Sequence, residues 1–307
     1  MKTTLDAGGG LSPTHREGIA AIQKHLLRTD FDVDSLAPIQ PEELAAVVVD
    51  PALREQLVSS LVTAAMLSEH VDERHAEAVE RFAAALDVAP VTVRQLRNLA
   101  EENLWRLRLD VIRQGPGPDG IRKLYEQSGA LSVVKNILGF AGLIENPEIA
   151  ARYHALEGYP EGTLGKELFD FYSKRGFKFP GEKGGAPEAL LAHDLSHVLG
   201  GYDTDIRSEA QVLAFTAGYR REKVFGPLVF MIVQAQHGLR LTPLAEAYTG
   251  LLSTPHVVTE MIEAFARGSR MNVDLVGDWD FWAVMDQPVS ELRRRYGIDE
   301  EPAALAA

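Results

Sequence analysis

The chain has 307 residues, of which 46% are hydrophobic and 24% are charged, a composition typical of a globular protein long enough for two domains. Its net charge of −13 and its lack of any long block of Lys or Arg exclude nucleic acid as an expected partner. It contains no cysteine, which excludes disulfides, thiolate metal ligands and cysteine nucleophiles.

No stretch of the sequence predicts secretion or a bilayer crossing. The first fifteen residues lack the apolar core of a signal peptide. The longest apolar run, Val224 to Val233, contains Gly226 and Pro227 and is far shorter than the roughly 20 residues that cross a bilayer. We therefore expect a cytoplasmic protein, and peripheral contact with the inner membrane stays open.

Helical periodicity and proline starts predict a series of helices in the first 110 residues. We expect helices over 13–28, from Pro41, from Leu57, over 75–86 and over 91–108. A charged bend, Glu69 to Arg74, separates two of them. With no partner at ligand spacing, His70 and His75 at this bend are expected to be surface residues.

Residues 59–109 resemble the TerB-like family of small acidic helical modules. Members carry an acidic turn between two helices and a glutamate in the next helix. The corresponding turn here, SEHVDERHAEAVE (68–80), lacks the Asp-Gly pair that is common in that family. A solvated charged turn between packed helices is therefore favoured over a cation site.

The segment RQGPGPDG (113–120) predicts a domain boundary, because two prolines and three glycines in eight residues cannot continue a helix. We divide the chain into an N-terminal helical module, residues 1–114, and a C-terminal metal-binding domain, residues 121–307. Further helices are expected over 131–140, 147–156 and 163–175. With no repeat and no sustained strand-like alternation, the prediction is an all-α fold in two helical domains.

The stretch HDLSHVLGGYDTDIRSE (193–209) carries the residue types that bind a metal ion. His193 and His197 are four residues apart, so on a helix starting at Pro187 both imidazoles lie on one face. The two glycines at 200 and 201 are expected to end that helix. A second helix, starting near Asp205 as its N-cap, can return Glu209 to the histidines.

Two imidazoles and one carboxylate suit zinc, or non-haem iron where coordination positions stay open. The predicted metal-site residues are therefore His193, Asp194, His197 and Glu209. Asp194 follows the first histidine directly, so it has three open roles: a metal ligand, an orienting partner of a histidine, or a catalytic group that moves protons.

The order His193-Asp194-x-x-His197, eleven residues, then Glu209, is similar to the signature of the Coq-four family of coenzyme-Q biosynthesis. The similarity extends upstream to GTLGKELFDFY (162–172) and downstream to DWDFWAVMDQPVSELRRRYGI (278–298), and covers residues 144–298. The resemblance implies an all-α fold with a metal, usually zinc, beside an apolar channel for a prenylated ring.

The resemblance also implies a metal-dependent lyase or oxidoreductase of quinone biosynthesis. Its substrate would be a prenylated or lipid-like aromatic ring, whose carboxylate is replaced by hydroxyl in an oxidative decarboxylation. Family members organise other enzymes of the pathway at membranes, so such enzymes are candidate partners, as is a second copy of the chain. The apolar helix expected over 224–236 is either a core helix or a wall of the lipid pocket.

Three other interpretations stay open. ALLAHDLSH (189–197) is also similar to the His-Asp dyad of HD-type metallophosphohydrolases, which require an upstream histidine, for which His154 is the nearest candidate. A zinc peptidase would need a glutamate where Asp194 stands. A non-catalytic lipid-binding scaffold could use the same ligands for a structural metal. An apolar tunnel at the metal would favour a prenyl substrate, and a polar basin with basic residues would favour phosphate esters.

Overall fold

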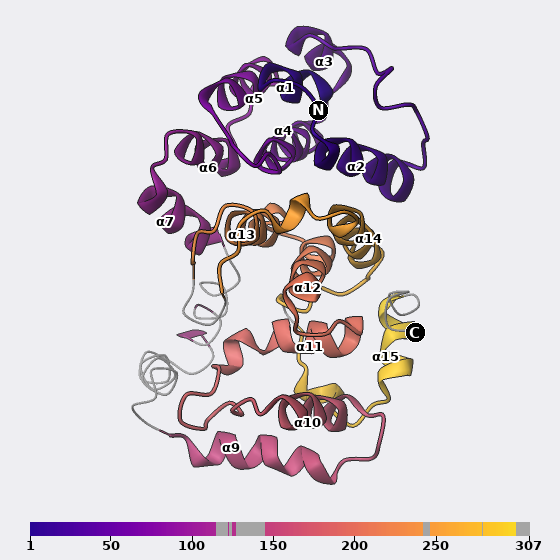
Figure 1. Ribbon diagram of the computed structural model, residues 1–307. Helices are drawn as coiled ribbons and strands as arrows, with labels where there is room; N and C mark the ends of the chain where they lie inside the picture. The colour runs from indigo at the N-terminus through magenta and orange to yellow at the C-terminus, as the bar shows by residue number, and fades with distance from the viewer. Residues whose placement is uncertain (115–121, 123–124, 127–144, 242–245, 278, 299–307) are drawn as a thin grey trace. The chain divides into compact units, whose positions relative to one another are not determined.

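The structure, a computed structural model, describes residues 1–114, 122, 125–126, 145–241, 246–277 and 279–298 (Figure 1). Within these ranges the chain forms helices and no β-strand, and its extended pairings are two isolated bridges, Thr163 with Pro288 and His237 with Thr249. The predicted all-α fold is confirmed. The helix expected over 131–140 lies outside the described residues.

The first of two compact units combines Met1–Gln114 with Lys223–Ala266. Its helices are α1 (Lys2–Ala7), α2 (Pro13–Ile22), α3 (Pro41–Val47), α4 (Pro51–Met66), α5 (Glu73–Ala85), α6 (Val91–Ala100), α7 (Leu104–Gln114), α13 (Phe225–Ala235) and most of α14 (Val257–Ser269). Residues 223–266 thus pack with the N-terminal helices, whereas the sequence-based division places them in the C-terminal domain. That linear division remains a prediction.

Helix α13 packs closely on the N-terminal helices α4 and α7. A Cβ atom on Gly226 would lie 2.4 Å from the carbonyl oxygen of Gln114, so only glycine permits this approach to the end of α7. Beyond α13, Gln236 Nε2 donates to the Leu67 carbonyl at 3.2 Å and His237 Nε2 donates to the Met66 carbonyl at 2.8 Å. These bonds satisfy carbonyls at the C-terminal end of α4, which have no N–H partner within the helix.

Prolines begin two helices of this unit as predicted, Pro13 in α2 and Pro41 in α3. The start predicted at Leu57 is wrong, because α4 begins six residues earlier at Pro51, where the Asp50 side chain caps it by accepting from the Leu53 N–H.

The single helix predicted over 91–108 is wrong, because the chain breaks it into α6 and α7. Glu102 takes a left-handed conformation with φ of 54°, and the N–H of Asn103 bonds back to the Asn98 carbonyl at 2.8 Å. This geometry ends a helix and lets the next one start in a new direction.

The charged bend before α5 is a helix cap. Asp72 is the N-cap residue, and its carboxylate accepts hydrogen bonds from the backbone N–H groups of Arg74 and His75. His70 is exposed as expected, but the prediction for His75 is wrong because its ring is buried in the capping box beside Ser68. The TerB-like resemblance of this segment stays a prediction.

The second unit combines Gly115–Glu222 with Arg267–Ala307. Its described helices are α9 (Pro147–His154), α10 (Leu164–Arg175), α11 (Leu191–Gly200), α12 (Ile206–Tyr219) and α15 (Val289–Tyr296). Helix α11 packs against α10, α12 and α15 (Figure 1). The helix that carries the two predicted histidine ligands is therefore supported by three neighbours.

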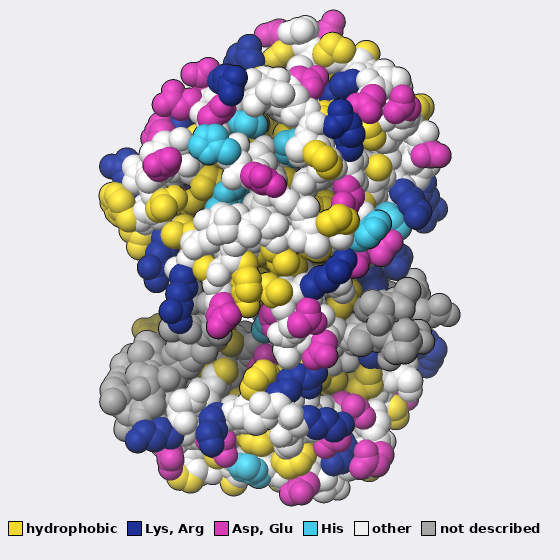
Figure 2. All heavy atoms as spheres, in the orientation of Figure 1, with side chains coloured by type: hydrophobic (Ala, Val, Ile, Leu, Met, Phe, Trp, Pro, Cys, Tyr) yellow, Lys and Arg dark blue, Asp and Glu magenta, His cyan; other side chains and the backbone are white. Residues whose placement is uncertain are grey.

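Acidic and basic side chains are interspersed over the face of the molecule shown in Figure 2, and no continuous basic area covers it. No helix in the described part of the chain has both the length and the apolar character needed to cross a bilayer.

Candidate metal centre

Helix α11 holds the two histidines on a firmly packed support. The chain enters it through a short 3₁₀ turn, Glu188–Leu190, so the helix proper starts at Leu191 and not at Pro187. On one side of the helix, Leu191, Leu195 and Leu199 are each at most 1% exposed. This apolar side fixes the rotation of α11, and with it the direction in which the imidazoles point.

The predicted glycine stop is confirmed at Gly201. This residue takes a left-handed conformation with φ of 72°, and its N–H donates to the His197 carbonyl at 2.7 Å. The chain then reaches Asp205, the predicted N-cap of α12, whose Oδ1 accepts from the N–H groups of Arg207 at 3.0 Å and Ser208 at 3.3 Å. Glu209 lies in the first turn of α12, which packs against α11.

The side chains of His193, His197 and Glu209 converge on one point. The two Nε2 atoms are 3.2 Å apart, Oε2 of Glu209 lies 3.3 Å from Nε2 of His193, and Oε1 of Glu209 lies 3.3 Å from Nε2 of His197. In the described part of the chain, these three form a group of potential metal ligands within 4.8 Å of one another. Ligand atoms about 2.0–2.1 Å from a tetrahedral zinc ion are separated by roughly 3.3–3.4 Å. The observed spacings therefore fit zinc.

The neutral tautomer of His197 keeps a lone pair on Nε2, the nitrogen that faces His193 and Glu209. Its Nδ1 lies 3.3 Å from the Tyr202 carbonyl oxygen, which can only accept, so Nδ1 carries the proton and Nε2 does not when the ring is neutral. Two unprotonated Nε2 atoms repel each other at 3.2 Å unless a proton or a cation lies between them. A metal ion would resolve this contact.

The electrostatics of the cluster keep Glu209 ionised. Burial favours its neutral form, but hydrogen bonds from His193 and His197 outweigh burial and lower the pKa of Glu209 to about 2. Burial also opposes charging of His193, yet its hydrogen bond to Glu209 and the charges of Glu209 and Asp194 raise the pKa of that imidazole. In the absence of metal, a proton on His193 takes the place of the cation.

The cluster is open on one side. The His197 side chain is 1% exposed, whereas those of His193 and Glu209 are 34% and 32% exposed. Three protein ligands on a tetrahedral ion leave a fourth position for water or substrate, as in catalytic zinc sites. Solvent can reach that position past His193 and Glu209.

Asp194 lies beside the three converging residues and is not one of the group. Its Oδ2 accepts a hydrogen bond from the hydroxyl of Tyr172 on α10. Burial raises the pKa of Asp194, and burial together with the negative charge of Asp194 raises the pKa of Tyr172. The placement of Asp194 therefore favours two roles over that of a direct metal ligand: orienting the neighbouring histidine, or holding a proton.

A second set of side chains, which the sequence reasoning missed, supports His197. The Phe171 ring packs on the His197 ring with centroids 5.5 Å apart, and the Arg175 guanidinium lies 4.2 Å from the Phe171 centroid. Arg175 also forms an ion pair with Asp203, next to Tyr202. The spacing of four between Phe171 and Arg175 on one helix face was the available sequence signal.

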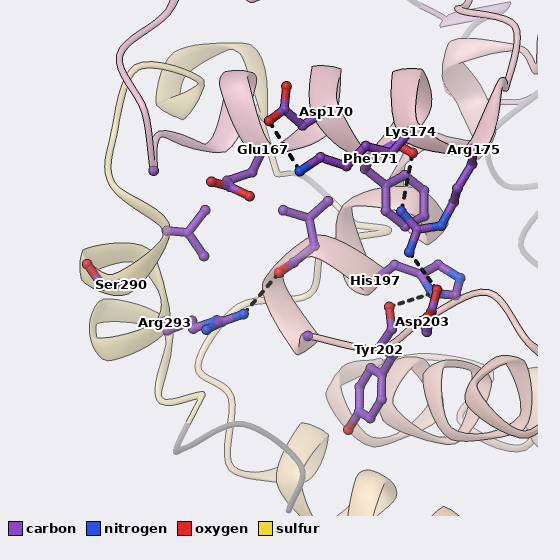
Figure 3. A pocket seen from close by; sticks show the side chains of 14 residues that line it. Glu167, Asp170, Phe171, Lys174, Arg175, His197, Tyr202, Asp203, Ser290 and Arg293 are labelled. Atoms are coloured by element: carbon purple, nitrogen blue, oxygen red, sulfur yellow. Dashed lines mark hydrogen bonds and ion pairs between the residues drawn. The ribbon is translucent and has the colours of Figure 1, made fainter. Parts of the chain in front are cut away.

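A polar pocket of about 510 Å³ borders His197 between α10, α11 and α15 (Figure 3). Its basic side chains are held by the protein: Lys174 pairs with Asp170 at 3.4 Å, Arg175 pairs with Asp203, and Arg293 donates to the Leu199 carbonyl at 2.9 Å. This pocket is not the apolar channel that the family resemblance implies. Its balanced charges also differ from those of a strongly basic phosphate site.

The histidine that an HD-type phosphohydrolase would need does not join the cluster. His154 Nε2 instead lies 2.9 Å from a Glu182 carboxylate oxygen, and the His154 ring packs on Phe179 with centroids 4.8 Å apart. Its side chain is 51% exposed. Nothing in this arrangement directs His154 to His193, His197 or Glu209.

No family profile and no curated protein sequence matches the chain. Among solved structures, it is similar to the 2.85 Å crystal structure of a protein from Nostoc punctiforme PCC 73102 that is proposed to act in ubiquinone biosynthesis. The two sequences are 21% identical, the match covers 68% of this chain and 95% of that chain, and the TM-score is 0.36. The donor set and spacing of His193, His197 and Glu209 are therefore the basis of any functional assignment.

Proposed function

We propose that the second unit binds one divalent metal ion, zinc foremost, through His193, His197 and Glu209, and acts there on a lipid-like aromatic substrate of the quinone type. The observation that carries this proposal is the convergence of three side chains from two helices, with the two histidine nitrogens 3.2 Å apart and a different oxygen of the Glu209 carboxylate 3.3 Å from each nitrogen. The same donor set occurs in the facial triad of non-haem iron enzymes, so iron is the alternative metal.

The open side of the cluster favours catalysis over a purely structural role. Structural zinc sites are closed by four protein ligands, whereas the His193 and Glu209 side chains here are about one-third exposed. A bound metal would polarise a substrate carboxylate at this position. The neighbouring polar pocket suits the polar ring of such a substrate, and the non-catalytic scaffold remains the alternative.

Replacing a ring carboxyl by hydroxyl is the reaction that the motif resemblance implies. The bond between the ring carbon and the carboxyl carbon breaks and CO₂ leaves. A new carbon–oxygen bond forms with an oxygen atom from water, and dioxygen takes up the two electrons and two protons that are released and leaves as hydrogen peroxide, so that ArCOOH, H₂O and O₂ give ArOH, CO₂ and H₂O₂. Asp194, with its pKa raised by burial, can hold a proton beside His193, and Tyr172 keeps its carboxylate in place.

Metal analysis of the purified chain tests the site. We expect about one metal ion per chain in the wild type and almost none in His193→Ala and Glu209→Ala, because each substitution removes one of three ligands. His154→Ala is the matched control and should keep its metal, since that ring pairs with Glu182. Unchanged metal content in both ligand variants would refute the proposal.

The nature of the metal and the co-purifying lipid test the chemistry. Iron would permit electron transfer to dioxygen, whereas zinc would restrict the site to polarisation and proton chemistry. Mass spectrometry of lipids extracted from the purified protein should detect a prenylated aromatic ring. Its depletion in a variant that has lost the metal would link that lipid to this site.

A further inference from the structure

The first compact unit contains an apolar cavity of about 150 Å³. None of the proposed metal-site residues lines it. Its walls come from α1, α2, α4, α13 and α14, and include Ile19, Leu67, Phe225, Ile232 and Met261. Helix α13 therefore serves both as a core helix and as a cavity wall. Leu26, at 37% exposure, and the exposed Gln56 also line the cavity, so the cavity reaches the surface.

None of the described side chains that line the cavity is Lys, Arg, Asp or Glu. Two of its hydroxyls have backbone partners: Ser60 Oγ donates to the Gln56 carbonyl at 2.8 Å, and Thr63 Oγ1 donates to the Ser60 carbonyl at 3.1 Å. The lining also includes Met1 and the exposed Gln56, and burial lowers the pKa of the Met1 amino group to about 6, so that group is mostly neutral at neutral pH. His15 accepts from the Ser12 N–H and bonds to Ser68 at 3.1 Å. Burial lowers the pKa of His15 to about 4, so the ring is neutral at neutral pH.

The size and polarity of the cavity restrict its occupant. Most of the lining surface is apolar, and the hydroxyls of Ser60 and Thr63 and the His15 ring have partners within the protein. An apolar cavity of about 150 Å³ can bind a ligand as large as benzene. The volume is too small for the row of side chains that a partner helix would insert. It suits one chain of methylene or isoprene carbons whose remainder extends to the surface.

We propose that this cavity binds the end of a neutral apolar chain, alkyl or isoprenoid, with about six to ten carbons inside or at its mouth. Because filling an empty apolar volume restores lost packing contacts, the ligand should stabilise the first unit against unfolding. The inference does not rest on the metal centre.

Calorimetric titration of the full-length protein with 1-octanol and with geraniol tests the proposal and separates a straight chain from a branched isoprenoid one. Thr63→Phe and Gly18→Leu fill the cavity: a Cβ on Gly18 would lie 3.3 Å from Val258 and 3.5 Å from Leu67. Glu55→Phe, at an exposed site on α4 outside the cavity, is the matched control.

We expect saturable 1:1 binding of at least one alcohol, a higher unfolding temperature on binding, and at least tenfold weaker binding in both filled variants but not in Glu55→Phe. Slower amide hydrogen exchange in α2 and α14 on binding checks the location without any substitution. Absence of saturable binding, or equal binding by the filled variants, would overturn the proposal.

A His193→Ala variant keeps the two proposals distinguishable. If the chain binds in the cavity, this variant should bind the alcohols as the wild type does, even when it has lost its metal. Loss of binding in His193→Ala would place the apolar chain at the metal centre and would contradict the cavity assignment.

Discussion

The Nδ1 atom of His197 lies 3.3 Å from the carbonyl oxygen of Tyr202, and this contact decides which ring nitrogen faces Glu209. The carbonyl is in position because Gly201, one residue earlier, turns the chain with a φ of 72°. A backbone conformation that favours glycine thus sets the tautomer of a candidate metal ligand.

Gly201→Ala should lower the free energy of unfolding by about 1–2 kcal/mol, because a Cβ at a left-handed position is strained. Metal affinity should fall with it, as the Tyr202 carbonyl shifts away from His197. Denaturant unfolding and metal titration measure the two effects. Gly158→Ala is the control, since that residue has no positive φ and open space around its Cβ position; equal losses in both variants would contradict the prediction.

Asp205→Ala should destabilise the start of α12, where Glu209 lies, by about 0.5–2 kcal/mol. Alanine cannot accept from the N–H groups of Arg207 and Ser208 as the Asp205 carboxylate does. Asp205→Asn keeps an acceptor oxygen and should retain most of the stability. Thermal unfolding of the three proteins checks the order, and an Asn variant as unstable as the Ala variant would show that charge and not capping matters.

Arg175→Ala should lower metal affinity roughly tenfold, within the range seen when groups that orient a ligand are removed. The substitution removes the cation that stacks on Phe171 and pairs with Asp203, and both contacts hold His197. Arg152→Ala is a matched control, because Arg152 makes a similar stack on Trp282 away from the histidines. Competition with a chelator of known affinity measures the metal affinities of both variants. Equal affinities would show that Arg175 does not support His197.

The metal-free cluster should stabilise the protein most in mildly acidic solution. The pKa of Glu209 is lowered in the folded state, so its contribution is present above its unfolded pKa of about 4.3 and is lost as pH falls towards about 2. The pKa of His193 is raised, so its contribution is complete below about pH 6.5 and is lost as pH rises through the folded value.

The stability difference between the metal-free wild type and Glu209→Gln should therefore peak between about pH 4.3 and 6.5. Metal binding should show the opposite trend and strengthen as pH rises, because the ion displaces the proton from His193. Unfolding and metal titrations at several pH values measure both. A difference that grows steadily up to pH 9 would contradict the assignment of the shifts.

Ser68→Ala should lower the free energy of unfolding by about 1–3 kcal/mol, because buried ring nitrogens lose a partner. The Ser68 hydroxyl lies 3.1 Å from His15 Nε2 and 3.3 Å from His75 Nε2, and all three residues are buried. Ser60→Ala, whose hydroxyl bonds only to its own helix backbone, should change stability by less than about 0.5 kcal/mol. Denaturant unfolding of both variants provides the comparison.

Local signals predicted those parts of the fold that depend on neighbours in sequence. Prolines at the first turns of α2 and α3, the Asp205 cap and the Gly201 stop all act within a few residues, and each lies where the sequence indicates. The break at Glu102 was missed because glutamate seldom adopts a positive φ and gives no signal for it.

By itself, the sequence determined that the fold is helical, and it indicated that His193, His197 and Glu209 could share one point, because helical spacing and a short capped turn are local properties. Tertiary packing alone decided that residues 223–266 join the N-terminal helices, that His75 is buried, and that Tyr172 bonds to Asp194. These contacts link helices far apart in the chain, where side-chain shape and burial, not periodicity, select the partner.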